Sequence, residues 1–430
     1  MMGKTFARLA GGLTLSLVAG EAQAGSFYLT QQSVRAAGRA TAGEAADQGP
    51  ESLWWNPAAI GGATRITGAL GAVAIFPTAR VRDRGTRIAR PGQPAAAVGG
   101  DPSPPNPAKR GVLPTGAIAV PVTERVALGI AVTSPFSFET NYAADSWTRY
   151  IADQTKLLTI DIQPGVAVAL TERLRVGAAL NVEYSKATLA KALPNLLATL
   201  PDGYQQLKGD GWDTGWSAGG QYVGDGISIG LSYKSSIKHK LGGTLAITGL
   251  LGPLAASNTR FETTASFRTP WQAIAALRVK ATDLVTLNLQ VTRFGWNKFD
   301  RVRLAIPAGA FIPEDYRNTW NVAAGADYDV SPDLTLRGGV YRDQTPTQDG
   351  VRDPNVPDAN RTAFALGATQ RLTDAIRLDL AFEYIRFDRS GIDRQSIAFE
   401  GTPVATQILT NGRLTSGRAL TFGAGVRFAL

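Results

Sequence analysis

Apolar and polar residues alternate with a period of two along most of the chain beyond residue 63. In the last stretch, one face carries Leu420, Phe422, Ala424, Val426, Phe428 and Leu430, and the other carries Thr421, Gly423, Gly425 and Arg427. Segments 174–183, 285–292 and 376–384 repeat this arrangement. Such an alternation predicts β-strands that each have one apolar face and one polar or small face.

The alternation and the turn residues divide the chain into fourteen predicted strands: 64–76, 113–122, 125–133, 156–170, 173–185, 212–223, 227–241, 261–279, 284–294, 316–328, 334–342, 361–371, 376–386 and 414–430. Tight turns such as Thr171-Glu172 alternate with long loops, among them 81–111 and 186–209. We expect a short helix in the loop 186–209. A Greek-key sandwich would not give this regularity. We therefore predict an all-β fold, a 14-stranded antiparallel transmembrane β-barrel with both termini at the short-turn, periplasmic side.

The first 63 residues do not follow the strand pattern. Lys4 and Arg8 precede an apolar stretch at 9–19 and a small-residue site, Ala22-Gln23-Ala24, which together predict a signal peptide at 1–24. That apolar stretch is too short to cross a bilayer as a helix. Residues 25–63 are rich in Gly and Ala, and we predict that they form a hatch, a plug folded into the lumen of a barrel that spans 64–430.

Composition excludes several other classes of protein. The chain has no cysteine and one histidine, so we predict no disulfide, no metal site and no cofactor. The net charge of +9 comes without a basic run interleaved with aromatic residues, which argues against binding of nucleic acid. We expect most of the cationic side chains to face the lumen or lipopolysaccharide. Residues 215–219 fit the G-x-S-x-G motif around Ser217, but they fall within a predicted strand with no helix after it, so we predict no catalytic residues and no enzyme.

Several short motifs carry a family resemblance that covers nearly the whole mature chain. The N-terminal segment contains Phe27, Gly38-Arg39-Ala40, Gly43-Glu44 and the triplet Asn56-Pro57-Ala58, and the later motifs fall at 133–142, 212–219, 337–346 and 357–361. These motifs resemble those of the FadL/OmpP1/TodX family of outer-membrane transporters for hydrophobic compounds. The terminal segment 425–430 is also similar to the assembly signal of outer-membrane barrels, although it ends in Leu430 rather than an aromatic residue.

The resemblance implies a route for greasy solutes across the outer membrane. Long-chain fatty acids or other hydrophobic small molecules would be captured at extracellular loops and would move to an inner site at the hatch. They would leave sideways into the membrane through a gap at a kinked third strand, with no energy-coupling partner. The expected contacts are therefore the ligand, outer-membrane lipid and lipopolysaccharide. Two alternatives stay open: uptake of aromatic or alkane hydrocarbons by the same route, and a sealed structural or adhesive barrel.

The resemblance also implies particular site residues. Phe27, Asn56, Pro57 and Ala58 would take part in gating by the hatch. Ser137 stands where the family has its kink glycine, and Pro135 could still break the ladder there. Lys191 and Asp343 match charged positions near the inner site, where a cation could pair with a fatty-acid carboxylate. A cationic residue in the inner pocket would favour fatty acids, whereas an uncharged pocket would favour hydrocarbons.

Overall fold

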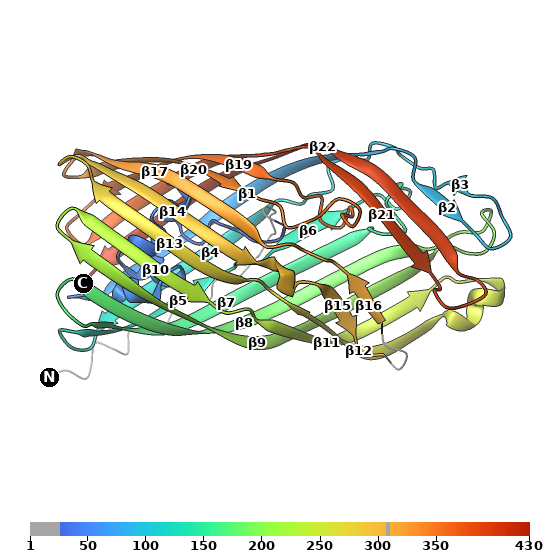
Figure 1. Ribbon diagram of the computed structural model, residues 1–430, viewed down its shortest axis with the longest axis horizontal. Coiled ribbons are helices and arrows are strands. Elements are labelled where there is room, and N and C mark those ends of the chain that lie inside the picture. Colours follow the sequence, from blue (N-terminus) through green and yellow to red (C-terminus); the bar gives the residue numbers. More distant parts are fainter. Residues whose placement is uncertain (1–25, 307–309) are drawn as a thin grey trace.

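The computed structural model describes residues 26–306 and 310–430, so the predicted signal peptide lies outside the described residues. The described strands form one closed antiparallel sheet, a barrel of fourteen strands, which confirms the predicted fold (Figure 1). The first and last strands, β1 and β22, close the barrel, with Thr67 opposite Ala429. No helix within the described ranges is long and apolar enough to cross a membrane.

Several of the fourteen barrel strands are interrupted and carry two labels. In chain order they are β1 (Thr67–Asp83), β4 (Gly111–Pro121), β5 with β6 (Val126–Thr133, Phe138–Asn141), β7 (Gln154–Ala169), β8 (Leu174–Leu193), β9 (Gly203–Gly224), β10 with β11 (Ile227–Lys234, Lys238–Thr248), β12 with β13 (Thr259–Arg268, Trp271–Lys280), β14 with β15 (Val285–Gly295, Arg301–Leu304), β16 with β17 (Ala310–Pro313, Thr319–Ser331), β18 (Leu334–Asp343), β19 (Arg361–Arg371), β20 with β21 (Ile376–Phe387, Ser390–Ala398) and β22 (Thr406–Ala429). The long loops also hold β2 (Arg87–Ala89), β3 (Ala96–Ala97) and the 3-10 turn η5 (Gly252–Ser257), and the 3-10 turn η6 (Trp296–Lys298) lies in the break between β14 and β15.

The predicted alternation matches the two faces of the wall. Leu70, Phe422 and Leu366 point outward and are more than half exposed, at 55%, 51% and 64%. Polar side chains such as Asp161 and Glu183 point inward and are buried at 1% exposure. An apolar outer band around a polar interior is the arrangement expected of a barrel surrounded by lipid.

Several predicted loops were partly wrong because strands continue through them, and two of these loops show the reason. Strands β8 and β9 pair without a break from Leu174↔Tyr222 to Leu193↔Gly203, so the loop 186–209 with its short helix shrinks to residues 194–202. Strand β1 runs past Pro77 to Asp83, beyond the predicted end at 76. Its pairing with β4 stops at Ile75, so this edge of the ladder is open where proline lacks its N–H, and Asn106 donates to the Pro77 carbonyl instead.

Residues 26–63 fill the lumen at the short-turn end as a compact segment, which we call the hatch (Figure 1). It contains α1 (Val34–Ala37) and the 3-10 turns η2 (Glu44–Ala46), η3 (Pro50–Trp54) and η4 (Pro57–Ile60), and nearly all of its residues are buried. Glycines let it approach the wall closely, since a Cβ on Gly177 of β8 would lie 2.5 Å from the Pro57 backbone.

Buried ion pairs bind the hatch to the wall. Arg39 contacts Glu44 at 2.5 Å and Asp47 at 2.8 Å within the hatch, and Asp327 of β17 at 2.7 Å. A second link joins Arg427 of β22 to Glu51 at 3.5 Å. These buried charges are paired rather than isolated, so they hold the body of the hatch in one position.

Candidate functional site

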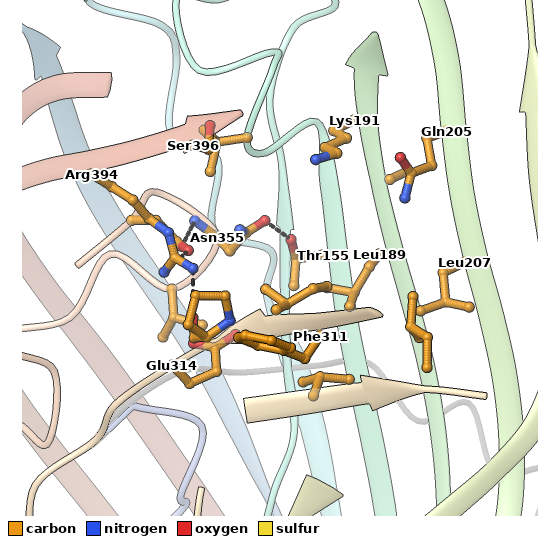
Figure 2. Close-up of a pocket in the computed structure, with 18 of the residues that line it drawn as sticks. Thr155, Leu189, Lys191, Gln205, Leu207, Phe311, Glu314, Asn355, Arg394 and Ser396 are labelled. Carbon is orange, nitrogen blue, oxygen red and sulfur yellow. Dashed lines mark hydrogen bonds and ion pairs between the residues drawn. The ribbon is translucent and has the colours of Figure 1, made fainter. Parts of the chain in front are cut away.

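A cavity of about 800 Å3 lies between the hatch and the long-loop end of the barrel (Figure 2). Its hatch end is apolar and partly aromatic, lined by Phe27, Phe138, Leu157, Leu207, Leu241, Phe267, Phe299 and Val302. Its other end is polar, lined by Thr155, Lys191, Gln205, Glu314, Asn355 and Arg394. The cavity is therefore amphipathic, with a size typical of small-molecule sites.

The register of β8 and β9 explains how the polar and apolar ends follow one another. Lys191 lies directly opposite Gln205, Leu189 opposite Leu207, and Ala187 opposite Gly209, and all six residues line the cavity. Residues directly opposite each other on one face of a sheet have Cβ atoms about 5 Å apart. We call each of these cross-strand pairs a rung. One polar rung followed by apolar rungs toward the hatch thus forms a strip that matches a molecule with a charged head and an apolar tail.

Lys191 differs from the other cavity cations in its partners. Arg394 contacts Asp353 at 2.9 Å, Lys156 contacts Glu139 at 3.1 Å, and Arg87 donates to the Ala95 carbonyl at 3.0 Å. Lys191 is partly buried, and within the described part of the chain it has neither a hydrogen bond nor an ion pair for its ammonium group. Figure 2 shows its side chain beside that of Gln205, whose amide group likewise has no hydrogen bond in the described residues. The polar end of the cavity therefore has two hydrogen-bond donor groups, the Lys191 ammonium and the Gln205 amide, that have no acceptor within the described residues.

Glu314 brings a carboxyl group to the same cavity from the segment between β16 and β17. Burial and the neighbouring Asp353 raise its pKa to about 8, although Arg394 acts in the opposite direction. Glu314 is therefore mainly neutral at pH 7, and it ionises as the pH rises through about 8.

Phe27 of the hatch forms part of the cavity floor, at the centre of an aromatic cluster. Its ring centroid lies 5.0 Å from Trp296, 5.0 Å from Phe299 and 5.9 Å from Phe138. Because edge-to-face and offset contacts of this kind stabilise aromatic pairs, the cluster holds the start of the hatch under the cavity. A ligand that fills the cavity must rest on Phe27 or displace it.

The hydrogen-bonded ladder of the barrel wall is interrupted beside this floor. Strand three breaks between Thr133 of β5 and Phe138 of β6, and its pairing with β4 stops at Gly116↔Val132. Backbone bonding to the preceding segment resumes only where the Lys109 N–H donates to the Glu139 carbonyl, at 3.1 Å. We call the interval between β4 residues 111–115 and strand-three residues 133–138 the side window. The predicted Pro135 and Ser137 both lie in it.

The hatch closes the side window from inside. The Leu29 N–H donates to the Pro135 carbonyl at 2.9 Å, and the Ser137 N–H donates to the Phe27 carbonyl at 3.1 Å. Gln32 adds two bonds: its amide donates to the Ser134 carbonyl at 3.2 Å and accepts from the Ser134 N–H at 3.0 Å. Hatch residues 27–32 thus take the place that β4 vacates along strand three.

Asn56, Pro57 and Ala58 lie on the other side of the hatch, against β8 and β9, and outside the cavity lining. The Asn56 amide oxygen caps η4 by accepting from the Ala58 N–H at 3.0 Å. Its amide nitrogen donates to the carbonyls of Ala45, at 2.8 Å, and Gly220 of β9, at 3.1 Å. The triplet therefore joins two turns of the hatch to the wall, and it does not contact the side window.

Asp343 also lies away from Lys191. It ends β18 and contacts Arg361 at 2.5 Å, and both side chains are buried outside the cavity lining. Ser217 accepts a hydrogen bond from Gln163 at 3.0 Å, and His239 is 3.2 Å from Ser185. The structure thus places Phe27 and Lys191 in the cavity lining, and Pro135 and Ser137 at the break in strand three. It adds Gln205, Gln32 and Glu314, which the sequence did not single out.

A plugged fourteen-stranded barrel with an amphipathic cavity above its plug defines the class: a channel of the outer membrane for hydrophobic compounds. The chain belongs to the family described as outer membrane protein transport protein (OMPP1/FadL/TodX), whose family model matches residues 15–429. The family consists of transport channels and not of enzymes.

Individual relatives resemble the chain over nearly its full length. A 47 kDa outer membrane protein of Pasteurella multocida is 27% identical, covering 90% of this chain and 92% of its own. A long-chain fatty acid transport protein of Escherichia coli O6:H1 is 24% identical, covering 99% and 98%. Among solved structures, a FadL homologue of Pseudomonas aeruginosa has a TM-score of 0.80 at 21% identity, covering 94% and 99%. The Ralstonia pickettii toluene transporter TbuX has a TM-score of 0.64 at 17% identity, also covering 94% and 99%.

Proposed function

We propose that the protein takes up long-chain fatty acids, or similar carboxylated hydrophobic compounds, by passive movement through this cavity. The observation that carries the proposal is the Lys191–Gln205 rung at the polar end, with apolar rungs below it. A partly buried ammonium group without a partner is costly, and a carboxylate would supply both a charge and hydrogen-bond acceptors. The ligand head then points to the long loops and its tail to the hatch.

The energetics favour capture without an energy-coupling partner. Apolar surface that leaves water in the cavity contributes about 25 cal/mol per Å2. If the side window beside the cavity floor opens toward the membrane, a ligand released there does not return to water. We therefore include lateral release at strand three in the proposal, with residues 27–32 of the hatch as the part that yields. Asn56-Pro57-Ala58 would support gating indirectly by fixing the rest of the hatch, and the Asp343–Arg361 pair would act in the wall rather than on the ligand.

Replacing Lys191 by methionine tests this proposal. Removing a charged hydrogen-bond donor costs about 1.5–3 kcal/mol, so the K191M variant should bind a long-chain fatty acid on the order of 10- to 100-fold more weakly. Uptake of a neutral solute such as toluene should stay unchanged. Lys156→Met is the matched control, because Lys156 also lines the cavity but has Glu139 as its partner. Equal fatty-acid affinity in K191M and wild type would overturn the assignment of the carboxylate site.

Uptake of aromatic or alkane hydrocarbons is the second candidate. The aromatic floor around Phe27 would suit a small neutral ring, and one structural relative is called a toluene transporter. A variant K191M that loses no activity on any substrate would favour this candidate. A sealed structural barrel fits less well, because strand three is interrupted rather than continuous.

A further inference from the structure

A cluster of cations lies on the outer surface of the barrel, apart from the cavity. It consists of Lys186 of β8, Lys208 of β9, Lys238 and Lys240 of β11, and Arg268 of β12, and we call it the basic patch. All five side chains are exposed. They belong to adjacent strands, because β9 pairs with both β8 and β11, and β11 pairs with β12.

The aromatic residues below the basic patch fix its height in the membrane. Tyr184 packs against Trp212 with ring centroids 5.3 Å apart, and Tyr233 packs against Trp271 at 6.1 Å. Trp212 is 58% exposed on the outer face. Exposed tyrosine and tryptophan on a barrel mark the boundary between hydrocarbon and head groups. On β8, Lys186 lies two residues beyond Tyr184 toward the long loops, so the patch sits at head-group level of the outer leaflet.

The charges of the basic patch are not balanced by the protein. Within the described residues, none of the five cations forms an ion pair or a side-chain hydrogen bond. Lys238 lies directly opposite Arg268 on the same face, and like charges in that position destabilise a sheet.

The carboxylates near the basic patch have other hydrogen-bond or ion-pair partners, and they are fewer than the five cations. Asp210, opposite Lys186, shares the face and is hydrogen-bonded to Tyr184. Glu262 accepts from Thr244 at 3.1 Å, and Asp213 lies 3.5 Å from the buried His239 and accepts from the Lys240 backbone N–H at 2.9 Å. A bound anion would remove the repulsion that remains.

The middle of the basic patch is also uncovered. Gly242 faces outward between Lys240 and Thr244, and a Cβ there would meet no atom within 4 Å. A head group can therefore approach the backbone between the cations.

We propose that the basic patch is a binding site for lipopolysaccharide, and specifically for the phosphate groups on the acylated sugar of its lipid A end. Lysine and arginine donate charge-assisted hydrogen bonds to phosphate oxygens, while acyl chains lie on the apolar surface below Trp212. The occupant must combine several anionic groups with acyl chains at the membrane boundary, and in the outer leaflet this lipid does so. The site is independent of solute transport, since none of its five cations lines the cavity.

The test uses the full-length protein in detergent and two probes: purified lipopolysaccharide and the same material after enzymatic removal of the lipid A phosphates. The triple variant Lys238→Gln, Lys240→Gln and Arg268→Gln should bind intact lipopolysaccharide on the order of 10- to 100-fold more weakly than wild type. The matched triple Arg125→Gln, Arg173→Gln and Lys280→Gln removes three exposed cations at the short-turn end and should bind normally.

Wild type should lose a similar factor when the phosphates are removed, and its binding to the intact lipid should weaken at high salt. Fatty-acid binding by the first triple variant should be unchanged, which separates this test from that of the cavity. Equal binding of the intact lipid by wild type and the first triple variant would overturn the proposal. Equal binding of the two probes by wild type would do the same.

Discussion

Locking the hatch to strand three should stop transport. Tyr28 and Phe136 face each other as an antiparallel bridge, with the flanking bonds of Leu29 to Pro135 and Ser137 to Phe27. This places them as a non-hydrogen-bonded pair with Cα atoms about 4.5 Å apart, within the range that a disulfide spans. The chain has no cysteine of its own, so Tyr28→Cys with Phe136→Cys creates a single defined pair.

The structure gives the free energy that normally closes the side window. Four hydrogen bonds join residues 27–32 to strand three, at 2.9, 3.1, 3.2 and 3.0 Å. At about 1 kcal/mol net for each bond, they favour the closed state by about 4 kcal/mol. From these hydrogen bonds alone, the open state would be populated at no more than about one part in a thousand without ligand, a fraction that ligand binding can raise. A disulfide removes this population altogether.

The assay is uptake of a labelled fatty acid by cells, with and without a reductant. The oxidised double variant should transport at background level, and reduction should restore most of the activity. The two single-cysteine variants control for the loss of the Tyr28 and Phe136 rings, and they should not respond to reductant. Full transport by the oxidised form would refute the reasoning, because the solute would then leave by a path that does not open between residues 28 and 136.

Two further predictions concern pH and the body of the hatch. Fatty-acid affinity should fall as the pH rises through about 8, by on the order of tenfold, because Glu314 then adds a negative charge beside the ligand head; binding by Glu314→Gln should be flat over this range. The raised pKa also means that Glu314 stabilises the fold below its ordinary pKa and that this contribution is lost as the pH rises through about 8. Arg39→Leu should destabilise the hatch by about 3–5 kcal/mol, since Glu44 and Asp327 lose a buried partner. Single-channel recordings should show opening events in this variant and none in the exposed control Arg65→Leu.

The sequence predicted the wall of the barrel better than its cavity. Outward residues such as Phe422 must be apolar and inward ones such as Thr421 are not, so period-two alternation identifies those strands. The rule fails where the inner face is apolar as well. Leu189 and Leu207 line the cavity, so the alternation of apolar and polar residues is lost at the ends of β8 and β9. For this reason the sequence predicted a loop with a short helix there.

The binding residues show a second limit of sequence reasoning. Lys191 was found through a family resemblance. That Gln205 lies opposite it depends on strand register, which a long hairpin with a nine-residue loop does not reveal. Pairing Lys191 with Gln205 requires knowing that β8 continues to Leu193. In the same way, the bonds of Gln32 to Ser134 join positions 102 residues apart. Polar side chains that hydrogen-bond to backbone groups at a break in a β-ladder produce no periodic pattern in the sequence, so they cannot be recognised from it.

The contacts of the hatch divide it into a fixed body and a releasable start. Its body is held by Arg39 and Glu51, whose buried ion pairs cost several kcal/mol to break. Its start is held by four hydrogen bonds and by the ring of Phe27, so residues 27–32 can move while the body stays and the lumen remains blocked. A ligand can favour this motion only if it binds the open state more tightly. A tail long enough to compete with Phe27 for its aromatic neighbours meets that condition, whereas a short solute held near Lys191 does not. We therefore expect tail length, rather than head-group affinity alone, to set the rate of release.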